Sequence, residues 1–323
     1  MFMDKFSFDK DAGVDLSVYL HEEKPEFSRV TKRPFVLVIP GGGYSFCSER
    51  EGEPIALHFA AHGYHAGVLR YHVGEHRDFQ KALDDGKQAL AKIRELAAEW
   101  AIDTDKIAVI GFSAGGHLAA AMSNLLEEKP SLCVLGYPAI LKSFSDVMQI
   151  DAPSLETCVS PETPPTFLFS TFEDNVVPIE NSLLYLRALE ENDVPFETMI
   201  FQKGKHGLSL ATKYYGAKEE MIDPRFARWF KTCVEWMEIN WAEIKQTDKN
   251  LPLQDKPIKE LWRNLKCKEL ILTYFPHWED RSRYKLIKNL SFTELMQLFP
   301  ARFQEKELHQ LYGKLTTIIG ETA

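Results

Sequence analysis

The stretch that decides the fold reads Lys106-Ile107-Ala108-Val109-Ile110-Gly111-Phe112-Ser113-Ala114-Gly115-Gly116-His117-Leu118. Its first part is a continuous apolar run, typical of a strand that is buried on both faces of a parallel sheet. Its second part has the pattern Gly-x-Ser-x-Gly and leads into a helical pattern over residues 114–127. A strand, a tight turn that carries a serine, and a helix are together the setting of a nucleophile elbow. On the motif alone, a glycine-rich turn without a catalytic role stays open as an alternative.

Strands and helices alternate on both sides of this stretch. Further short apolar runs predict strands at residues 35–39, 65–71, 132–136, 166–170 and 196–201. Amphipathic patterns predict helices from Pro54 to Gly63 and over residues 78–100, 179–191 and 224–244, the last with Asp223 as N-cap and Pro224 as its first residue. This order predicts an α/β fold with a doubly wound, mostly parallel sheet and flanking helices. Ligands of such a sheet gather at the carboxyl ends of its strands.

Composition divides the chain into two parts. The first 247 residues hold 25 Lys and Arg against 37 Asp and Glu, a net charge of −12, while residues 248–323 hold 13 against 10, a net charge of +3. The second part begins with prolines and then turns helical, with Ser291 and Glu294 at the spacing of a capping box. We expect a catalytic domain over residues 1–247, with a short cap at about residues 138–165, and a helical C-terminal extension of unknown role over residues 248–323.

Charge and cysteine content exclude several classes of function. A net charge of −9 argues against nucleic acid or an anionic membrane as a partner. No run approaches the roughly 18 apolar residues of a membrane span, and early charges argue against a signal peptide. Five dispersed cysteines suit a reducing cytoplasm. Whether the basic extension meets the acidic domain within one chain or across a homo-oligomer is left open.

A serine nucleophile needs a base and a group that orients the base. Among ten histidines, His206 is the best candidate for the base, because it lies between two glycines in a loop after the last predicted strand. Asp174 follows the strand at residues 166–170 and is the candidate acid, with Glu173 as its nearest rival and a helix N-cap as its structural alternative. His117 is expected to pack beneath the elbow. The order Ser113, Asp174, His206 is that of the α/β-hydrolases.

Three consecutive glycines end the strand at residues 35–39, in the sequence Pro40-Gly41-Gly42-Gly43-Tyr44. Glycines there let the backbone approach a ligand and direct N–H groups toward it, which indicates an oxyanion loop. A flexible turn is the alternative, and a phosphate loop is disfavoured because no Gly-Lys-Ser/Thr follows. Tyr44 and His72, which lies in a polar loop near a strand end, are expected to contact the substrate.

The sequence resembles the α/β-hydrolase superfamily, and within it the bacterial acetylesterase and xylan-esterase-like branch, over about residues 15–245. The resemblance rests on the stretches quoted above and on Arg50-Glu51-Gly52-Glu53-Pro54, Leu69-Arg70-Tyr71, Pro164-Pro165-Thr166-Phe167 and Lys205-His206-Gly207-Leu208. It implies Ser113 as nucleophile, His206 as base and Asp174 as the residue that orients it. Backbone N–H groups of Gly42, Gly43 and Ala114 would then form the oxyanion hole.

The resemblance implies a serine carboxylesterase that acts on a small-molecule ester without a metal or an organic cofactor. The short cap predicts short acyl groups, acetyl above all, and the resemblance alone suggests a sugar or another small polar alcohol. Two alternatives are open. One is an arylformamidase-like or other amide hydrolase on the same fold, and the other is a catalytically idle hydrolase fold that serves as a binding protein.

Overall fold

The computed structural model describes residues 1–22, 24–27, 29–216, 218–246, 251–300, 302–303 and 305–320. The chain forms two compact units, Met1–Ile244 and Lys245–Ala323. The expected boundary after residue 247 lies outside the described residues, and the structure divides the chain a few residues earlier. Each unit is described by itself below.

The first unit is built on one eight-stranded sheet with the order β1-β2-β4-β3-β5-β6-β7-β8. Strands β3 to β8 pair in parallel, whereas β1 and β2 add an antiparallel hairpin to β4. The strands span Phe2–Asp9 (β1), Val14–Leu20 (β2), Arg33–Ile39 (β3), His65–Arg70 (β4), Ile102–Phe112 (β5), Leu132–Gly136 (β6), Thr166–Thr171 (β7) and Phe196–Phe201 (β8). The predicted α/β class and the six predicted strands are confirmed.

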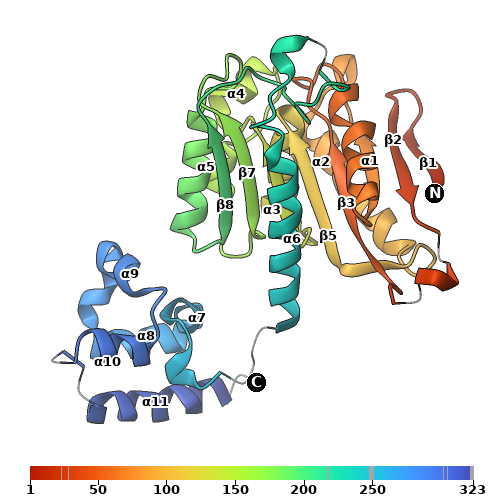
Figure 1. Ribbon diagram of the computed structural model, residues 1–323. Coiled ribbons are helices and arrows are strands. Elements are labelled where there is room, and N and C mark those ends of the chain that lie inside the picture. Colours follow the sequence, from red (N-terminus) through yellow and green to blue (C-terminus); the bar gives the residue numbers. More distant parts are fainter. Residues whose placement is uncertain are drawn as a thin grey trace. The chain divides into compact units, whose positions relative to one another are not determined.

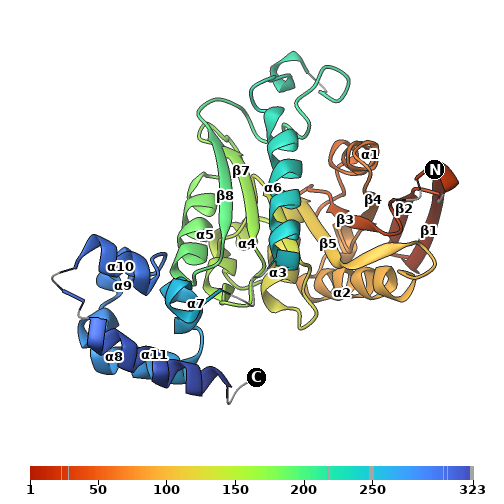
Figure 2. The same cartoon turned by 60° about the horizontal axis from the view of Figure 1, so that its bottom comes forward.

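Helices cover both faces of this sheet (Figures 1 and 2). They span Glu53–Ala61 (α1), Phe79–Glu95 (α2), Ala114–Leu125 (α3), Lys142–Val147 (α4), Glu180–Glu191 (α5) and Arg228–Gln246 (α6). Buried side chains of α2, α3 and α5 form one core cluster with the sheet, and those of α1 and α6 form another. Figure 2 shows α1 and α2 on opposite sides of the sheet. This is the doubly wound arrangement that the alternating pattern predicts.

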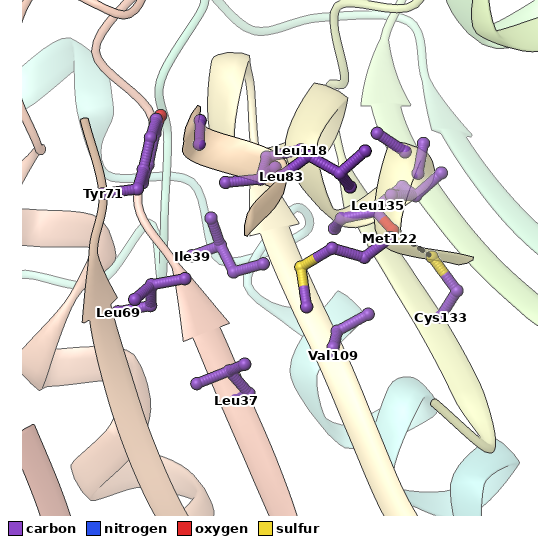
Figure 3. Packing of buried hydrophobic residues seen from close by; sticks show 14 of the residues in the cluster. Leu37, Ile39, Leu69, Tyr71, Leu83, Val109, Leu118, Met122, Cys133 and Leu135 are labelled. Atoms are coloured by element: carbon purple, nitrogen blue, oxygen red, sulfur yellow. Dashed lines mark hydrogen bonds between the residues drawn. The ribbon is translucent and has the colours of Figure 1, made fainter. Parts of the chain in front are cut away.

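The core between the sheet and α3 is shown in Figure 3. Met122 of α3 lies beside Val109 of β5 there, and Leu37 and Ile39 of β3 are close by. A Cβ atom at Gly86 of α2 would lie 2.5 Å from Met122 Sδ, so α2 approaches α3 closely at this glycine. Dense packing of this kind holds the turn between β5 and α3 in one position.

The start of α6 differs from the prediction. The helix begins at Arg228 rather than at Pro224. Asp223 Oδ1 accepts hydrogen bonds from the backbone N–H groups of Arg225 and Phe226, at 2.8 and 3.1 Å, so it closes a turn before the helix instead of capping it. The apolar side chains of this amphipathic helix are buried, and Trp229 stacks on Phe169 of β7 with ring centroids 4.2 Å apart.

The segment from residue 138 to residue 165, expected as a cap, is partly embedded in the core. Ile140, Met148 and Ile150 are buried in the same cluster as α3 and α5. Asn181 of α5 accepts hydrogen bonds from the backbone N–H groups of Ile140 and Leu141 through its side-chain oxygen. Much of the segment is therefore fastened to helices of the core.

The second unit is helical, as the sequence predicts. Its helices span Ile258–Trp262 (α7), Leu265–Tyr274 (α8), Arg281–Ile287 (α9), Phe292–Leu298 (α10) and Glu305–Gly320 (α11). The predicted capping box is present at α10, where Ser291 and Glu294 bond reciprocally to each other's backbone. Ile258, Phe292 and Leu311 belong to a separate small core. Within the described residues, no helix of either unit combines the length and the apolar composition that crossing a membrane requires.

Candidate active site

Ser113 occupies the turn between β5, which ends at Phe112, and α3, which begins at Ala114. Its backbone has φ 53° and ψ −116°, a strained conformation for a residue with a side chain. Two close approaches hold the turn: a Cβ atom at Gly111 would lie 2.1 Å from the oxygen of Gly115, and one at Gly115 would lie 2.1 Å from the oxygen of Ile39. The flanking glycines are therefore required by packing, and the turn has the geometry of a nucleophile elbow.

The structure brings Ser113, His206 and Asp174 together from the ends of three strands. The distance from Ser113 Oγ to His206 Nε2 is 2.8 Å, and His206 Nδ1 lies 2.7 Å from Asp174 Oδ2. The side chain of Asp174 is 2% exposed and that of His206 is 14% exposed, so the ring lies at the edge of the solvent while its partner is enclosed. This is the geometry in which a hydroxyl can pass its proton to an imidazole whose other nitrogen is fixed by a carboxylate.

Because α5 has Ile179 as its N-cap, Asp174 is not the helix N-cap that was its structural alternative. Its Oδ1 accepts from the backbone N–H groups of Val176 and Val177, both at 2.9 Å, while Oδ2 faces His206. The rival Glu173 is half-exposed and pairs with Lys203 at 3.4 Å, away from His206. Asn175 Oδ1 accepts the backbone N–H of His206 at 3.1 Å, so the loop after β7 holds both the ring and the backbone of the histidine.

The glycine loop after β3 lies against the elbow. A Cβ atom at Gly41 would lie 3.0 Å from Ser113 Cβ, and Gly42 and Gly43 follow with φ of 127° and 62°. Within the described part of the chain, the backbone N–H groups of Gly42, Gly43 and Ala114 donate to no protein acceptor. Free donors on a loop packed against the nucleophile, together with one at a helix N-terminus, are what an oxyanion hole requires.

The two expected substrate contacts are not supported. Tyr44 is fully buried, and its hydroxyl lies 3.0 Å from Nδ1 of His117, which packs beneath the elbow as predicted. His72 lies between two carboxylates: its Nδ1 is 2.7 Å from Asp85 Oδ2 and its Nε2 is 3.6 Å from Asp9 Oδ2. Burial raises the pKa of Asp85, an effect that the hydrogen bonds from His72 oppose. A position after a strand end does not determine where a side chain points, and both side chains have partners within the protein.

A second group of polar side chains adjoins the site, and no role for its members was predictable from the sequence. Glu51 is buried: its Oε2 accepts from the backbone N–H of Gly41 at 3.0 Å, and its Oε1 accepts from the hydroxyl of Tyr137 at 2.6 Å. The Tyr137 ring packs edge-on against His206, with ring centroids 5.0 Å apart. Burial and the nearby Glu51 carboxylate raise the pKa of Tyr137 well above its usual value, so its hydroxyl keeps its proton. Glu51 stood in the quoted motif, but nothing in the sequence connects it to Tyr137.

Among the described residues, no cluster of three or more His, Cys, Asp and Glu side chains is arranged to hold a metal ion.

Comparison with known proteins identifies matching family models and related proteins. A family model described as BD-FAE matches residues 18–134, and a model of the prolyl oligopeptidase family matches residues 141–235. The chain is 34% identical over 230 residues to endo-1,4-beta-xylanase B of Butyrivibrio fibrisolvens and 28% identical over 204 residues to acetylxylan esterase of Xylanibacter ruminicola. These alignments cover 61% and 56% of this chain, but 35% and 42% of the relatives. The chain thus spans less than half the length of both relatives.

A solved structure matches a larger share of the chain. The crystal structure of MGS-M1, an alpha/beta hydrolase enzyme from a Medee basin deep-sea metagenome library, matches with a TM-score of 0.70 and 39% sequence identity. The match covers 98% of that chain and 75% of this one.

Proposed function

We propose that this chain, which belongs to the α/β-hydrolase family, is a serine carboxylesterase. It would cleave short acyl esters through an acyl-enzyme. The observation that carries the proposal is the unbroken chain of contacts from Ser113 Oγ through His206 to Asp174, at 2.8 and 2.7 Å. The homology to an acetylxylan esterase supports an ester as the substrate.

In the proposed mechanism, His206 Nε2 takes the proton of Ser113 as Oγ attacks the ester carbonyl carbon. The carbonyl oxygen becomes an oxyanion and accepts hydrogen bonds from the N–H groups of Gly42, Gly43 and Ala114, each worth about 3–4 kcal/mol. His206 then gives its proton to the alcohol oxygen, and the alcohol leaves. Water, deprotonated by His206, attacks the acyl-enzyme and releases the carboxylic acid.

The proposed acyl group is short, with acetyl preferred, and the proposed alcohol is a sugar or another small polar alcohol. The segment from residue 138 to residue 165 commits Ile140, Met148 and Ile150 to the core, which leaves little apolar surface for a long acyl chain. The sugar rests on the names of the relatives, a xylanase and an acetylxylan esterase.

We also propose a cytoplasmic location. All five cysteines are free thiols, which is typical of proteins in a reducing compartment.

The test compares the wild type with Ser113→Ala on aryl esters of two to twelve carbons and on acetylated xylose. The wild type should be most active on acetyl esters, and Ser113→Ala should lose nearly all turnover, by about 10⁶-fold, because the nucleophile is gone. A fluorophosphonate should label the wild type and not the variant, which separates an active serine from an idle hydrolase fold.

N-formyl aromatic amides form a second arm of the same test, since an arylformamidase-like amide hydrolase on the same fold is the alternative that the sequence leaves open. Preference for the amides over the esters, or an optimum at eight carbons or more, would contradict the proposed substrate. Near-wild-type turnover by Ser113→Ala would contradict the mechanism itself.

A further inference from the structure

Glu51 is a buried carboxylate beside the site that the proposed mechanism does not use. Its side chain comes from the short helical turn Glu49–Glu51, just before α1, and the residue is 3% exposed. Its two oxygens point to different parts of the site, one to Gly41 N–H in the glycine loop and the other to the Tyr137 hydroxyl after β6. Burying a carboxylate costs free energy unless hydrogen bonds compensate, so the position requires an explanation.

The hydrogen-bond partners of Glu51 that the structure shows are both donors. The Tyr137 oxygen accepts the backbone N–H of Ser209 at 3.0 Å, so its own proton is directed to Glu51. Gly41 N–H is a donor in any state. Both oxygens of Glu51 therefore accept a hydrogen bond, one from each partner.

The same region is tied to the loop of the proposed base. Arg50 Nη1 donates to the oxygen of Gly207 at 2.9 Å, and Ser209 Oγ donates to the oxygen of Arg50 at 2.7 Å. Tyr137 in turn contacts the His206 ring. The glycine loop after β3 and the loop that carries His206 are thus both hydrogen-bonded to residues 50 and 51. More than 150 positions separate Arg50 from Gly207 and Ser209 in sequence.

We propose that Glu51 is a positioning residue whose carboxylate joins Gly41 to Tyr137 and thereby holds the oxyanion donors and His206 in register with Ser113. This inference rests on the proposed esterase function. Misplacement of reacting groups by about 1 Å can cost about 100-fold in rate without any loss of substrate affinity. Loss of the carboxylate should therefore lower kcat and leave KM nearly unchanged.

The test uses the full chain with Glu51→Gln, Tyr137→Phe and the double variant. Gln presents one acceptor oxygen and one amide donor, so it meets either Gly41 N–H or the Tyr137 proton and opposes the other. Tyr137→Phe keeps the ring against His206 and removes only the hydroxyl. We expect kcat for an acetyl ester to fall about 10- to 100-fold for Glu51→Gln, with KM within about threefold. The double variant should cost no more than the worse single variant, because both break one network.

Asp85→Asn is the matched control. Asp85 is 6% exposed, nearly as buried as Glu51, and it also has two hydrogen-bonding contacts, from its Oδ2 to the backbone nitrogen and to Nδ1 of His72. Every kcat is divided by the fraction of serine that a fluorophosphonate labels at completion, so that misfolded protein does not count. Asp85→Asn should lower the melting temperature while its kcat per labelled serine stays within about twofold of the wild type.

The outcomes separate the two proposals. If the wild type is neither labelled nor active, the proposed function fails. If the wild type is labelled and active but Glu51→Gln and Tyr137→Phe keep its kcat per labelled serine, Glu51 is only structural and the inference is overturned. An additive double variant would also overturn it, since the two residues would then act separately.

Discussion

Asp174 divides its hydrogen bonds between its two carboxylate oxygens. Oδ1 accepts from the backbone of Val176 and Val177, which fixes the side chain, and Oδ2 faces His206 Nδ1. A carboxylate held in this way keeps the imidazole proton on Nδ1 and leaves Nε2 free to accept from Ser113. One side chain therefore sets both the rotation of the ring and its tautomer.

Asp174→Asn separates these two effects. The asparagine oxygen can still accept from the two backbone N–H groups, but its amide nitrogen then faces His206 Nδ1. The imidazole proton moves to Nε2, where it opposes the Ser113 hydroxyl, so kcat should fall about 10³- to 10⁴-fold with little change in melting temperature. Steady-state kinetics measure kcat, and a thermal melt measures the melting temperature.

Glu173→Gln is the neighbouring control, because its carboxylate pairs with Lys203 and not with His206. Its kcat should match the wild type. Equal losses in the two variants would mean that the charge of the loop, and not the contact with His206, is what matters.

At the level of elements, close approaches of the backbone build the site. Gly115, in the first turn of α3, lies so near the end of β3 that a Cβ atom would be 2.1 Å from the oxygen of Ile39 and 2.4 Å from that of Pro40. Backbone oxygens at the end of a strand cannot move aside as the end of a side chain can. The contact of α3 with β3 thus sets where Ser113 stands relative to the glycine loop.

Gly115→Ala should therefore destabilise the first unit by about 3 kcal/mol or more, as overpacking of a rigid contact does. Gly313→Ala in α11 is the opposite case, because a Cβ atom there meets nothing within 4 Å. It should stabilise its helix by about 0.5–1 kcal/mol. Urea unfolding of both variants measures the change in the free energy of unfolding, which should be a loss for Gly115→Ala and a gain for Gly313→Ala. A Gly115→Ala protein as stable as the wild type would show that α3 can shift.

The elements also show what the sequence could predict. Strands β3 to β8 were predictable because each is a short apolar run between recognisable helices and turns. β1 was missed because it is an edge strand with mostly exposed side chains, and charges interrupt its apolar residues. The start of α6 was missed because Asp223 and Pro224 fit a helix start as well as the turn that they form.

In the site, the triad contacts follow from strand ends that a parallel sheet brings to one edge, so the three residues could be named in advance. Tyr44 and His72 also follow strands, yet their rings turn toward partners in the core and on α2. The contact between Glu51 and Tyr137 joins residues 86 positions apart through side chains alone. No local pattern encodes such a contact.

At the scale of the whole molecule, the first unit holds every predicted site residue and has both of its core clusters to itself. The second unit has its own small core. Each unit therefore has the means to fold by itself.

A chain that ends after Gln246, the last residue of α6, should keep the acetyl-esterase kcat within about twofold of the full chain. Its net charge would be more negative, because the removed part carries an excess of Lys and Arg. Kinetics and mass in solution of both forms provide the check. A large loss of kcat with an intact fold would assign the second unit a part in the reaction, and a change in oligomeric state would assign it a part in assembly.

Strand order has one more consequence for His206. β5, β6, β7 and β8 are consecutive in the sheet, so at about 4.8 Å per strand the base enters the site from roughly 14 Å away from the strand that carries Ser113. The loop that follows β8 extends back toward β5. It is held there by contacts with Asp174, Asn175, Tyr137 and Arg50. Substitutions at these four positions should therefore lower activity, whereas substitutions within β8 itself should be better tolerated.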